Sequence, residues 1–575
     1  MGYEWCVPEL SSVPTILVLS TSDTDLIAAR ASGAAYRWAN PSRLVDGELA
    51  ELLEGAQAVV VRILGGYRAW EDGIDQVVAA GVPAVVISGE QAPDADLMSH
   101  STVPAGVALE THVYFAQGGI ENMVNLHAFL SDTLLMTGFG FQPPASTPTW
   151  GVLECPAGFQ PSGDGPTVAV LFYRAQHLAG NTEYIGALCH AIHAAGGRPL
   201  AIYCASLRTP EPELLELLGT ADALITTVLA AGGAIPATVG AGGSDDQWSV
   251  AHLAALNVPI LQGLCLTSSR AQWSENDDGM SPLDVATQVA VPEFDGRIIT
   301  VPFSFKEIDD EGLISYVPDV ERCARVAGIA VRHARLRSIA PSEKRVALVF
   351  SAYPTKHARI GNAVGLDTPA SAVVLLRAMR DAGYEIGDVP GVDAEDGDAL
   401  VHALIERGGQ DQDWLSEGQL VGNPIRLSAK DYREWFATLP AELTDAMVEH
   451  GGPPPGELFV DRSRDPDGEI VIAAMLSGNV VILVQPPRGF GENPVAIYHD
   501  PDLPPSHHYL AAYRWLDKGF GADAVVHLGK HGNLEGLPGT TLGMSASCGS
   551  DAALGDLPLI YPFLVNDPGE GTQAK

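Results

Sequence analysis

The sequence has 575 residues, of which 46% are hydrophobic and 18% are charged. A chain of this length and apolar content predicts three or four domains of about 100–200 residues, each with its own core. The formal net charge of −38 reflects 71 acidic against 33 basic residues. Because such a field repels phosphate backbones and anionic lipid surfaces, we expect neither nucleic acid nor a membrane among the partners.

Two further features predict a cytoplasmic protein. The sequence contains no run of ~18 consecutive apolar residues, and Met1–Ser12 lacks the basic and then apolar layout of a secretory signal. The seven cysteines are far apart and form no C-x-x-C pair. We therefore expect reduced, mostly buried thiols rather than disulfides or a structural zinc site.

After a leader of residues 1–14, a first α/β domain is expected over residues 15–142. Its strand candidates are short apolar runs at Thr15–Ser20, Ala58–Ile63 and Pro83–Ser88. Continuous apolar runs of this length are typical of strands buried on both faces, as in parallel sheets covered by helices. The proline-rich segment 143–166 then predicts a linker.

A second α/β domain is expected over residues 167–340. Its strand candidates are Thr167–Phe172, Pro199–Tyr203, Ala223–Thr227 and Pro259–Gly263. The glycine-rich stretch 238–246 lacks the Lys-Ser/Thr ending of a phosphate-binding loop, and G-x-x-x-x-G-K-[ST] occurs nowhere in the sequence. Any ATP requirement must therefore be met elsewhere.

The third α/β domain is expected over residues 341–575, with strands at Arg345–Phe350 and Val480–Gln485. Asp367-Thr368-Pro369 supplies a cap and a first-turn proline, which predicts a helix start there. Like the second domain, it continues from its first strand through an irregular loop to a Gly-Asn pair and then a helix, which indicates an old duplication or a common α/β solution. Strands that alternate with helices predict several doubly wound, flavodoxin-like parallel-sheet domains.

Histidine is concentrated near the end of the chain, where five of the 16 lie between positions 499 and 531. The first part of this cluster carries His499, His507 and His508 among prolines and aspartates, in what we expect to be a stiffened loop. Imidazole and carboxylate are ligand types that a borderline divalent metal prefers. Adjacent residues of an extended loop point in opposite directions, so at most one of His507 and His508 is expected to face a site.

The second part of the cluster follows an apolar strand that ends at His527. A glycine-flanked turn with His531 comes next, and Glu535 lies just beyond. In open α/β sheets, ligands bind where strands end in loops at the carboxyl edge, so these three side chains could converge on one pocket. A buried ion pair or a helix cap formed by His531 and Glu535 is the structural alternative.

These motifs resemble the large subunit of aerobic cobaltochelatase and its magnesium chelatase relatives, the CobN/magnesium chelatase family. The resemblance is carried by H-x-G-x-H-G-x-L-E at 527–535, by His499–Tyr509 and by the closing segment 556–572. It extends through Arg345–Ala372 and Gln485–Pro494, and the whole chain looks like the actinobacterial version.

The resemblance implies that Co²⁺ is inserted into the corrin precursor hydrogenobyrinic acid a,c-diamide, on the aerobic route to cobalamin (vitamin B12). The large subunit of this family binds the tetrapyrrole and the metal. Two partner subunits form an AAA+ ATPase complex that uses ATP and Mg²⁺, which agrees with the missing phosphate-binding loop in this sequence.

The chemistry of metal insertion gives these residue types a reason. Metal insertion replaces ring N–H protons, so the site needs a base near the ring and ligands that strip water from the ion. We expect Glu535 and His531 to be catalytic, with Glu535 as the base. The expected metal ligands are His499, His527, His531 and Glu535. The expected contacts to substrate carboxylates are Lys356, Arg359, Arg488, His507 and His508, with ordinary surface charge as the alternative for the basic residues.

Three alternative functions stay open at this point. The chain could belong to a magnesium chelatase, which inserts Mg²⁺ into protoporphyrin IX, to a non-catalytic tetrapyrrole-binding module, or to an unrelated metal-dependent hydrolase. Gly536 and Thr540 depart from the large aromatic residue and the lysine of the family pattern, and both departures bear on catalysis. The resemblance runs unbroken to Lys575, which predicts a third domain truncated at its C-terminal side.

Overall fold

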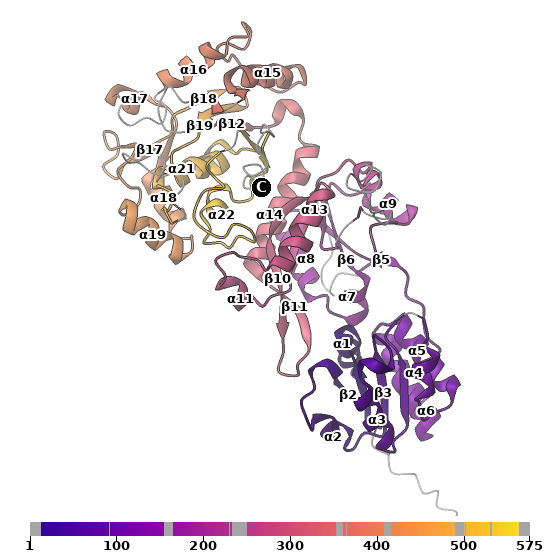
Figure 1. Ribbon diagram of the computed structural model, residues 1–575. Helices are drawn as coiled ribbons and strands as arrows, with labels where there is room; N and C mark the ends of the chain where they lie inside the picture. The colour runs from indigo at the N-terminus through magenta and orange to yellow at the C-terminus, as the bar shows by residue number, and fades with distance from the viewer. Residues whose placement is uncertain are drawn as a thin grey trace, which may run out of the picture.

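The computed structural model describes residues 13–90, 92–153, 165–228, 231–232, 250–351, 360–363, 365–407, 416–488, 500, 502–529 and 532–562. These residues form three α/β units, each built on its own mostly parallel sheet. The units follow one another along an elongated molecule, from the indigo N-terminal unit to the orange and yellow C-terminal unit (Figure 1).

The first unit is a parallel sheet of order β2-β1-β3-β4. Its strands are β1 (Ile16–Ser20), β2 (Tyr36–Ala39), β3 (Ala58–Ile63) and β4 (Ala84–Ser88). Its α-helices are α1 (Asp23–Ala31), α2 (Glu48–Leu53), α3 (Glu71–Ala79), α4 (Ala95–Ser99), α5 (Ala105–Gln117) and α6 (Ile120–Leu135). Ile16 and Val18 enter one hydrophobic cluster while Leu17 and Leu19 enter another, so β1 is buried on both faces. This is why its sequence is continuously apolar.

The second unit has the order β11-β10-β9-β8-β6-β7-β5, in which both edge strands are antiparallel to their neighbours. Its strands are β5 (Trp150–Val152), β6 (Thr167–Tyr173), β7 (Arg198–Cys204), β8 (Ala223–Thr226), β9 (Ile260–Leu266), β10 (Ile298–Ile308) and β11 (Ile314–Pro318). Its helices are α7 (Arg174–Ala179), α8 (Glu183–Ala194), α9 (Pro212–Leu218), α10 (Ala251–Ala254), α11 (Arg270–Ser274), α12 (Pro282–Asp284), the π-helix η4 (Val285–Ala290), α13 (Val291–Phe294) and α14 (Val320–Ser338).

Two features of the second unit differ from the sequence-based expectation. Strand β5 comes from the segment that we expected to be a linker and pairs with β7. The segment between β6 and Gly180 is not an irregular loop but the short helix α7, because residues 174–179 form a helical turn that ends at Gly180 with a φ of 73°. A left-handed residue at this position is a common helix stop, and glycine adopts it without strain.

The third unit has the order β18-β19-β12-β20-β21, with only the edge strand β18 antiparallel. Its strands are β12 (Val346–Phe350), β18 (Ala474–Ser477), β19 (Val480–Val484), β20 (Ala524–Leu528) and β21 (Leu559–Ile560). Two small sheets accompany it, formed by β13 (Asn362–Ala363) with β14 (Leu366–Asp367), and by β15 (Arg426–Ser428), β17 (Glu469–Val471) and β16 (Val460–Asp461).

The helices of the third unit cover its sheet. They are α15 (Thr368–Asp381), α16 (Gly397–Glu406), α17 (Glu417–Gly422), α18 (Ala429–Phe436), α19 (Ala441–Gly451), α21 (His507–Arg514), the π-helix η7 (Trp515–Phe520) and α22 (Gly549–Leu554). Helix α15 begins where the sequence predicted, because the Asp367 carboxylate accepts a hydrogen bond of 3.0 Å from the Ala370 amide. Such a bond satisfies one of the free N–H groups of the first turn.

All three sheets share one strand order. In each sheet, the second parallel strand lies on one side of the first, and the third parallel strand lies on the other side. The order in which strands are added therefore reverses at a switch point, which lies between β1 and β3, between β6 and β8, and between β12 and β20. This is the flavodoxin-like order of doubly wound sheets, and it confirms the predicted fold class. In the described ranges we find no helix that is both long enough and apolar enough to cross a membrane.

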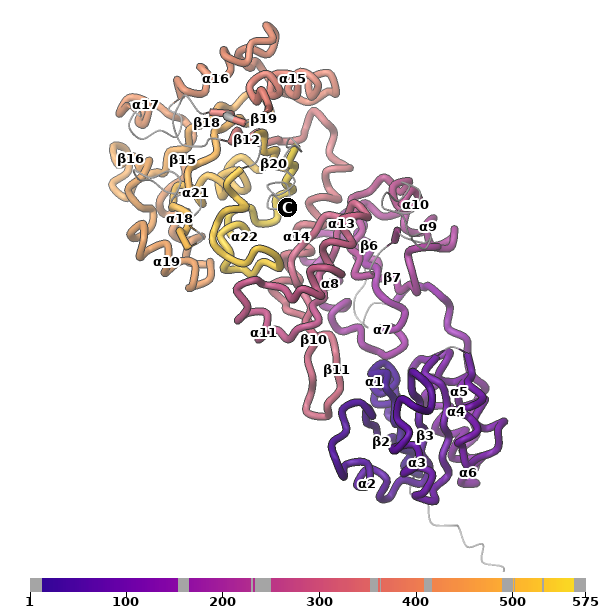
Figure 2. The backbone as a smooth tube through the Cα atoms, in the orientation of Figure 1, coloured from indigo at the N-terminus to yellow at the C-terminus, as the bar shows by residue number. Residues whose placement is uncertain are grey.

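Buried contacts join the three units. Leu313, in the turn of the β10-β11 hairpin, packs into a core cluster of the first unit, and Arg30 of α1 pairs with Asp309 of the hairpin. Figure 2 shows this hairpin reaching toward the first unit. On the other side, Arg322 of α14 is buried against Asp551 of α22, with 3.1 Å between Nη2 and Oδ2. Helix α14 therefore packs against the sheet of the second unit and also contacts the third unit.

Candidate functional site

Polar and titratable residues gather at the carboxyl edge of the third sheet. Gln485 follows β19, His527 lies near the end of β20 with Glu535 beyond it, and Tyr561 follows β21. Because parallel strands end at the same edge, these residues from distant parts of the chain come together beside the β12/β20 switch point. This is the place where doubly wound sheets bind ligands.

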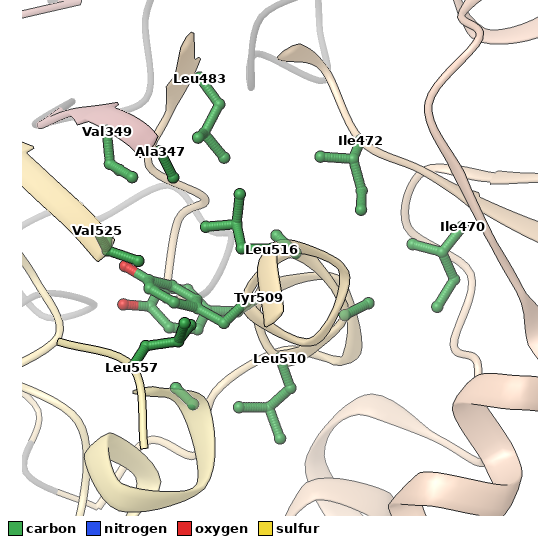
Figure 3. Packing of buried hydrophobic residues seen from close by; sticks show 14 of the residues in the cluster. Ala347, Val349, Ile470, Ile472, Leu483, Tyr509, Leu510, Leu516, Val525 and Leu557 are labelled. Atoms are coloured by element: carbon green, nitrogen blue, oxygen red, sulfur yellow. The ribbon is translucent and has the colours of Figure 1, made fainter. Parts of the chain in front are cut away.

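Helix α21 packs against this edge through two tyrosines. Tyr509 and Tyr513 are four residues apart, so their rings lie on one face of the helix, with ring centroids 5.2 Å apart. Figure 3 shows the Tyr509 ring pointing from its helix toward Val525 of β20, with Leu557 beside it. Both rings belong to the large hydrophobic cluster of the third unit, but their hydroxyl groups reach the polar edge.

The two hydroxyl groups are part of a buried hydrogen-bond network. Gln485 Nε2 donates to Tyr513 Oη at 2.9 Å and to Tyr509 Oη at 3.3 Å. Tyr509 Oη donates to Asn533 Oδ1 at 2.8 Å, and the Asn533 amide donates to Gln485 Oε1 at 3.0 Å. Tyr513 Oη lies 3.0 Å from Nε2 of His527. A buried network of this kind holds its members rigidly, and it fixes Asn533, beyond β20, against helix α21.

His527 is a neutral imidazole with one nitrogen available. Burial lowers the pKa of His527 to about 4, although the nearby Glu535 carboxylate acts in the opposite direction. Its Nδ1 is buried and has no hydrogen-bond partner in the described part of the chain. A neutral imidazole nitrogen is a common ligand of divalent transition metals.

Gly532 makes room at this nitrogen. A Cβ atom at position 532 would lie 3.0 Å from His527 Nδ1 and 2.9 Å from Tyr561 Oη, closer than side chains normally pack. A glycine is therefore needed where the turn passes the imidazole, which explains the glycine that follows the second histidine of the motif. Tyr561 Oη also lies 3.4 Å from Glu535 Oε1, as a donor to the carboxylate. Burial, followed by the Glu535 charge, raises the pKa of Tyr561 and keeps its hydroxyl protonated.

The Glu535 carboxylate acts on the pKa of the buried His527 imidazole, so these two side chains share one electrostatic environment. Their convergence with His531 on one pocket stays a prediction. His531, His499, Lys356 and Arg359 lie outside the described residues, so the complete ligand set is not tested. Among the residues that the structure does describe, no group of three or more His, Cys, Asp and Glu side chains is arranged to hold a metal.

Three of the expected substrate-binding residues line a separate cavity of about 180 Å³. They are Arg488, His507 and His508. The Arg488 side chain is buried, and its Nη2 donates to the carbonyl oxygens of Asp500 at 2.9 Å and Leu503 at 3.3 Å. This guanidinium therefore fixes the chain that leads into α21, and it also borders the cavity.

The expectation that His507 and His508 lie in an extended loop is wrong. They form the first turn of α21, where the Ser506 hydroxyl caps the helix by accepting a hydrogen bond of 3.2 Å from the Tyr509 amide. The alternation of an extended chain, on which we based the expectation that at most one of them faces a site, does not apply in a helix, and that expectation stays a prediction. Both line the same cavity.

The two imidazoles differ in how many of their ring nitrogen atoms have a hydrogen-bond partner. His507 Nδ1 lies 3.0 Å from Tyr432 Oη, and His507 Nε2 lies 2.9 Å from the Gly452 carbonyl oxygen. Neither nitrogen is left for a substrate, so the structure favours a packing role for His507. His508 Nε2 lies 3.1 Å from the Val471 carbonyl oxygen, while its Nδ1 is buried without a hydrogen-bond partner among the described residues. Burial lowers the pKa of His508 to about 4, so this ring is neutral as well.

Sequence reasoning missed Tyr509, Tyr513, Gln485, Asn533 and Tyr561. Each is a common residue type whose role depends on its position at the sheet edge. A usable signal was the spacing of Tyr509 and Tyr513, because residues four apart share a helix face.

Comparisons with known proteins agree with this geometry. The family described as CobN/Magnesium Chelatase matches residues 112–575. The chain belongs to the CobN/magnesium chelatase family. The aerobic cobaltochelatase subunit CobN of Pseudomonas aeruginosa is 36% identical over 99% of this chain and 46% of that protein. The chloroplastic magnesium-chelatase subunit ChlH of Oryza sativa subsp. indica is 28% identical over 72% of this chain and 28% of that protein.

A solved structure within the family is more similar still. The catalytic subunit of cobaltochelatase from Mycobacterium tuberculosis is 73% identical to this chain and superimposes with a TM-score of 0.88. The match covers 98% of this chain and 46% of the M. tuberculosis chain. The chain thus spans about half the length of the cobaltochelatase relatives that it matches.

Proposed function

We propose that this chain contributes to the large subunit of an ATP-dependent cobaltochelatase, which inserts Co²⁺ into hydrogenobyrinic acid a,c-diamide during aerobic cobalamin biosynthesis. The observation that carries the proposal is the 73% identity to the M. tuberculosis catalytic subunit over 98% of this chain. The magnesium chelatase alternative has weaker support, because the rice subunit is only 28% identical over 72% of the chain.

In this proposal the base is Glu535. Insertion of a divalent ion into the ring releases N–H protons, and a carboxylate held close to the ring accepts them. The hydrogen bond from Tyr561 Oη orients this carboxylate at the carboxyl edge of the sheet. Such support from a neighbouring group keeps a reactive side chain in one position.

The transient metal ligands are His527 and Glu535, together with His531 and His499. Support for His527 comes from its neutral imidazole and from the Nδ1 atom that no described group occupies. A site that must pass the ion on to the ring needs few ligands, because a full shell would retain the metal. The substrate carboxylates are met by Arg488, Lys356 and Arg359, with His508 beside Arg488.

The energy for insertion comes from ATP, which two AAA+ partner subunits hydrolyse with Mg²⁺. Support for this assignment is the absence of the G-x-x-x-x-G-K-[ST] motif from the sequence. A cytoplasmic location for the reaction stays a prediction.

The proposal is tested by mixing the purified chain with hydrogenobyrinic acid a,c-diamide, Co²⁺, ATP and the partner subunits, and following the corrinoid absorption spectrum. We expect selective binding of the corrinoid over protoporphyrin IX and ATP-dependent formation of the cobalt corrinoid. Corrinoid binding without insertion would favour the non-catalytic binding module. Insertion of Mg²⁺ into protoporphyrin IX would favour the magnesium chelatase alternative, and hydrolysis without ATP would favour the hydrolase.

A further inference from the structure

A cleft of about 360 Å³ lies between the first and second units. The first unit lines it with Ser22, Leu64 and Gly89, which follow β1, β3 and β4. The second unit lines it with Arg174 and Ala205, which follow β6 and β7. Helices α1 and α7 lie side by side at this junction (Figure 1). The carboxyl edges of two doubly wound sheets therefore face the same space, and each is the edge at which such sheets bind ligands.

Arg174 brings a positive charge to the cleft. Its Nε donates to the Pro148 carbonyl oxygen at 2.8 Å, and its Nη2 donates to the carbonyl oxygens of Thr147 at 2.9 Å and Gln117 at 3.4 Å. These acceptors are neutral. Burial lowers the pKa of Arg174, Tyr203 acts weakly in the opposite direction, and no carboxylate among the described residues forms an ion pair with this guanidinium. A partly buried guanidinium without a nearby opposite charge carries an unfavourable desolvation free energy, and an anion bound in the cleft would offset it.

The second arginine of the cleft, Arg62, is already neutralised. Its Nη1 lies 2.6 Å from Asp25 Oδ2, its Nη2 donates to the Gly89 carbonyl oxygen at 2.7 Å, and its guanidinium lies over the Phe115 ring at 5.5 Å. Among the described residues that line the cleft, the charged side chains are Asp25, Arg62 and Arg174. The lining therefore carries one net positive charge, in a protein whose formal net charge is −38.

The rest of the lining combines backbone donors with apolar surface. Helix α6 begins after Gly118 and Gly119, which have φ values of 67° and 99°. No side chain of the described residues caps its N-terminus, and its first turn carries one acidic residue, Glu121. Free N–H groups at a helix start favour a negative group nearby. The apolar contacts come from Leu64, Phe115, Met123 and Leu178. This lining suits an anion with a hydrocarbon body better than it suits inorganic phosphate.

We propose that this cleft binds a small organic carboxylate, with the carboxylate at Arg174 and an aliphatic body against the apolar wall. Its volume lies within the range of about 300–1,000 Å³ that is usual for small-molecule sites. The ligand touches both units, so its binding holds the first unit against the second. The proposal does not depend on metal insertion, since none of its residues belongs to the third unit.

Isothermal titration of the purified chain with hexanoate and, separately, with inorganic phosphate tests the proposal. We expect saturable binding of hexanoate and at least about 10-fold weaker binding to the Arg174→Gln variant, because the charge-assisted bonds are lost. The matched control is Arg68→Gln, at an exposed arginine of the first unit, and it should leave the affinity unchanged. Ala205→Phe, which fills the cleft without removing a charge, should also abolish binding.

Hydrogen exchange provides a second readout. Hexanoate should slow amide exchange in α1 and α7 of the native chain and of Arg68→Gln, but not in Ala205→Phe. The absence of saturable hexanoate binding would overturn the proposal, and so would equal affinity of the native and Arg174→Gln chains. Phosphate that binds as tightly as hexanoate would overturn the assignment to an organic carboxylate.

Discussion

Nε2 of His527 lies 3.0 Å from the phenol oxygen of Tyr513, and both residues are buried. This hydrogen bond joins the end of strand β20 to helix α21, which also contributes Tyr509 to the same network. The orientation of the imidazole at the candidate site is therefore set by a helix that precedes the motif in the chain.

Tyr513→Phe should destabilise the protein by about 1–3 kcal/mol, because it leaves His527 Nε2 buried without its partner and removes one acceptor of Gln485. Urea unfolding at pH 7.5 measures the change. Tyr67→Phe is the matched control, since its hydroxyl bonds to Asp75 at the surface and its loss should cost less than about 0.5 kcal/mol. Equal stability of the two variants would contradict the structural role of the network.

Acidification should destabilise the protein through His508 and His527. Burial lowers the pKa of each to about 4 in the folded chain. An unfolded histidine binds a proton below a pKa of about 6.5, so between about pH 6.5 and 4 the unfolded state holds more protons and stability falls. Each histidine should cost about 2 kcal/mol at pH 5, and nothing above about pH 7.5.

The contribution of one histidine is measured by comparing His508→Gln with the native chain in urea at pH 7.5 and at pH 5. The variant should lose about 2 kcal/mol less than the native chain between these two pH values. His402→Gln, at an exposed histidine, should show the full native loss. A native loss that His508→Gln leaves intact would show that this imidazole is not held neutral by burial.

Asp551→Asn should destabilise the contact between the second and third units by about 3 kcal/mol. Asp551 Oδ2 lies 3.1 Å from Nη2 of both Arg322 and Arg325, and its side chain is only 3% exposed. Removal of its charge leaves two arginines of α14 without this buried partner. Asp393→Asn breaks an exposed ion pair with Arg380 and should cost less than about 1 kcal/mol. Similar unfolding midpoints for the two variants would contradict this account of the interface.

Several parallel strands, but not the edge strands, could be predicted because they are buried on both faces. The run Val480–Gln485 became β19 over Val480–Val484, and Arg345–Phe350 became β12 over Val346–Phe350, each buried throughout. Helix α21 was missed because Pro504 and Pro505 indicated a loop, although Ser506 followed by apolar residues is also a helix-start signal. Pro504 and Pro505 directly precede Ser506, the residue that caps α21.

The candidate site was predictable only in part. His527 and Glu535 stand out because they follow an apolar strand in a glycine-rich turn, and the structure places both at the sheet edge. The residues that hold them, such as Gln485 and Tyr513, are distant in sequence and meet only through strand order and helix packing. Contacts between residues so far apart in the chain cannot be predicted from the spacing of residues in a motif or from composition.

The most direct test of the proposed function is the rate of ATP-dependent Co²⁺ insertion by Glu535→Gln in the reconstituted complex, with Glu417→Gln on exposed helix α17 as the matched control. We expect at least about a 100-fold lower rate for Glu535→Gln, because the base is lost, with unchanged affinity for hydrogenobyrinic acid a,c-diamide. An insertion rate equal to that of Glu417→Gln would contradict the role of Glu535 and the site built around it.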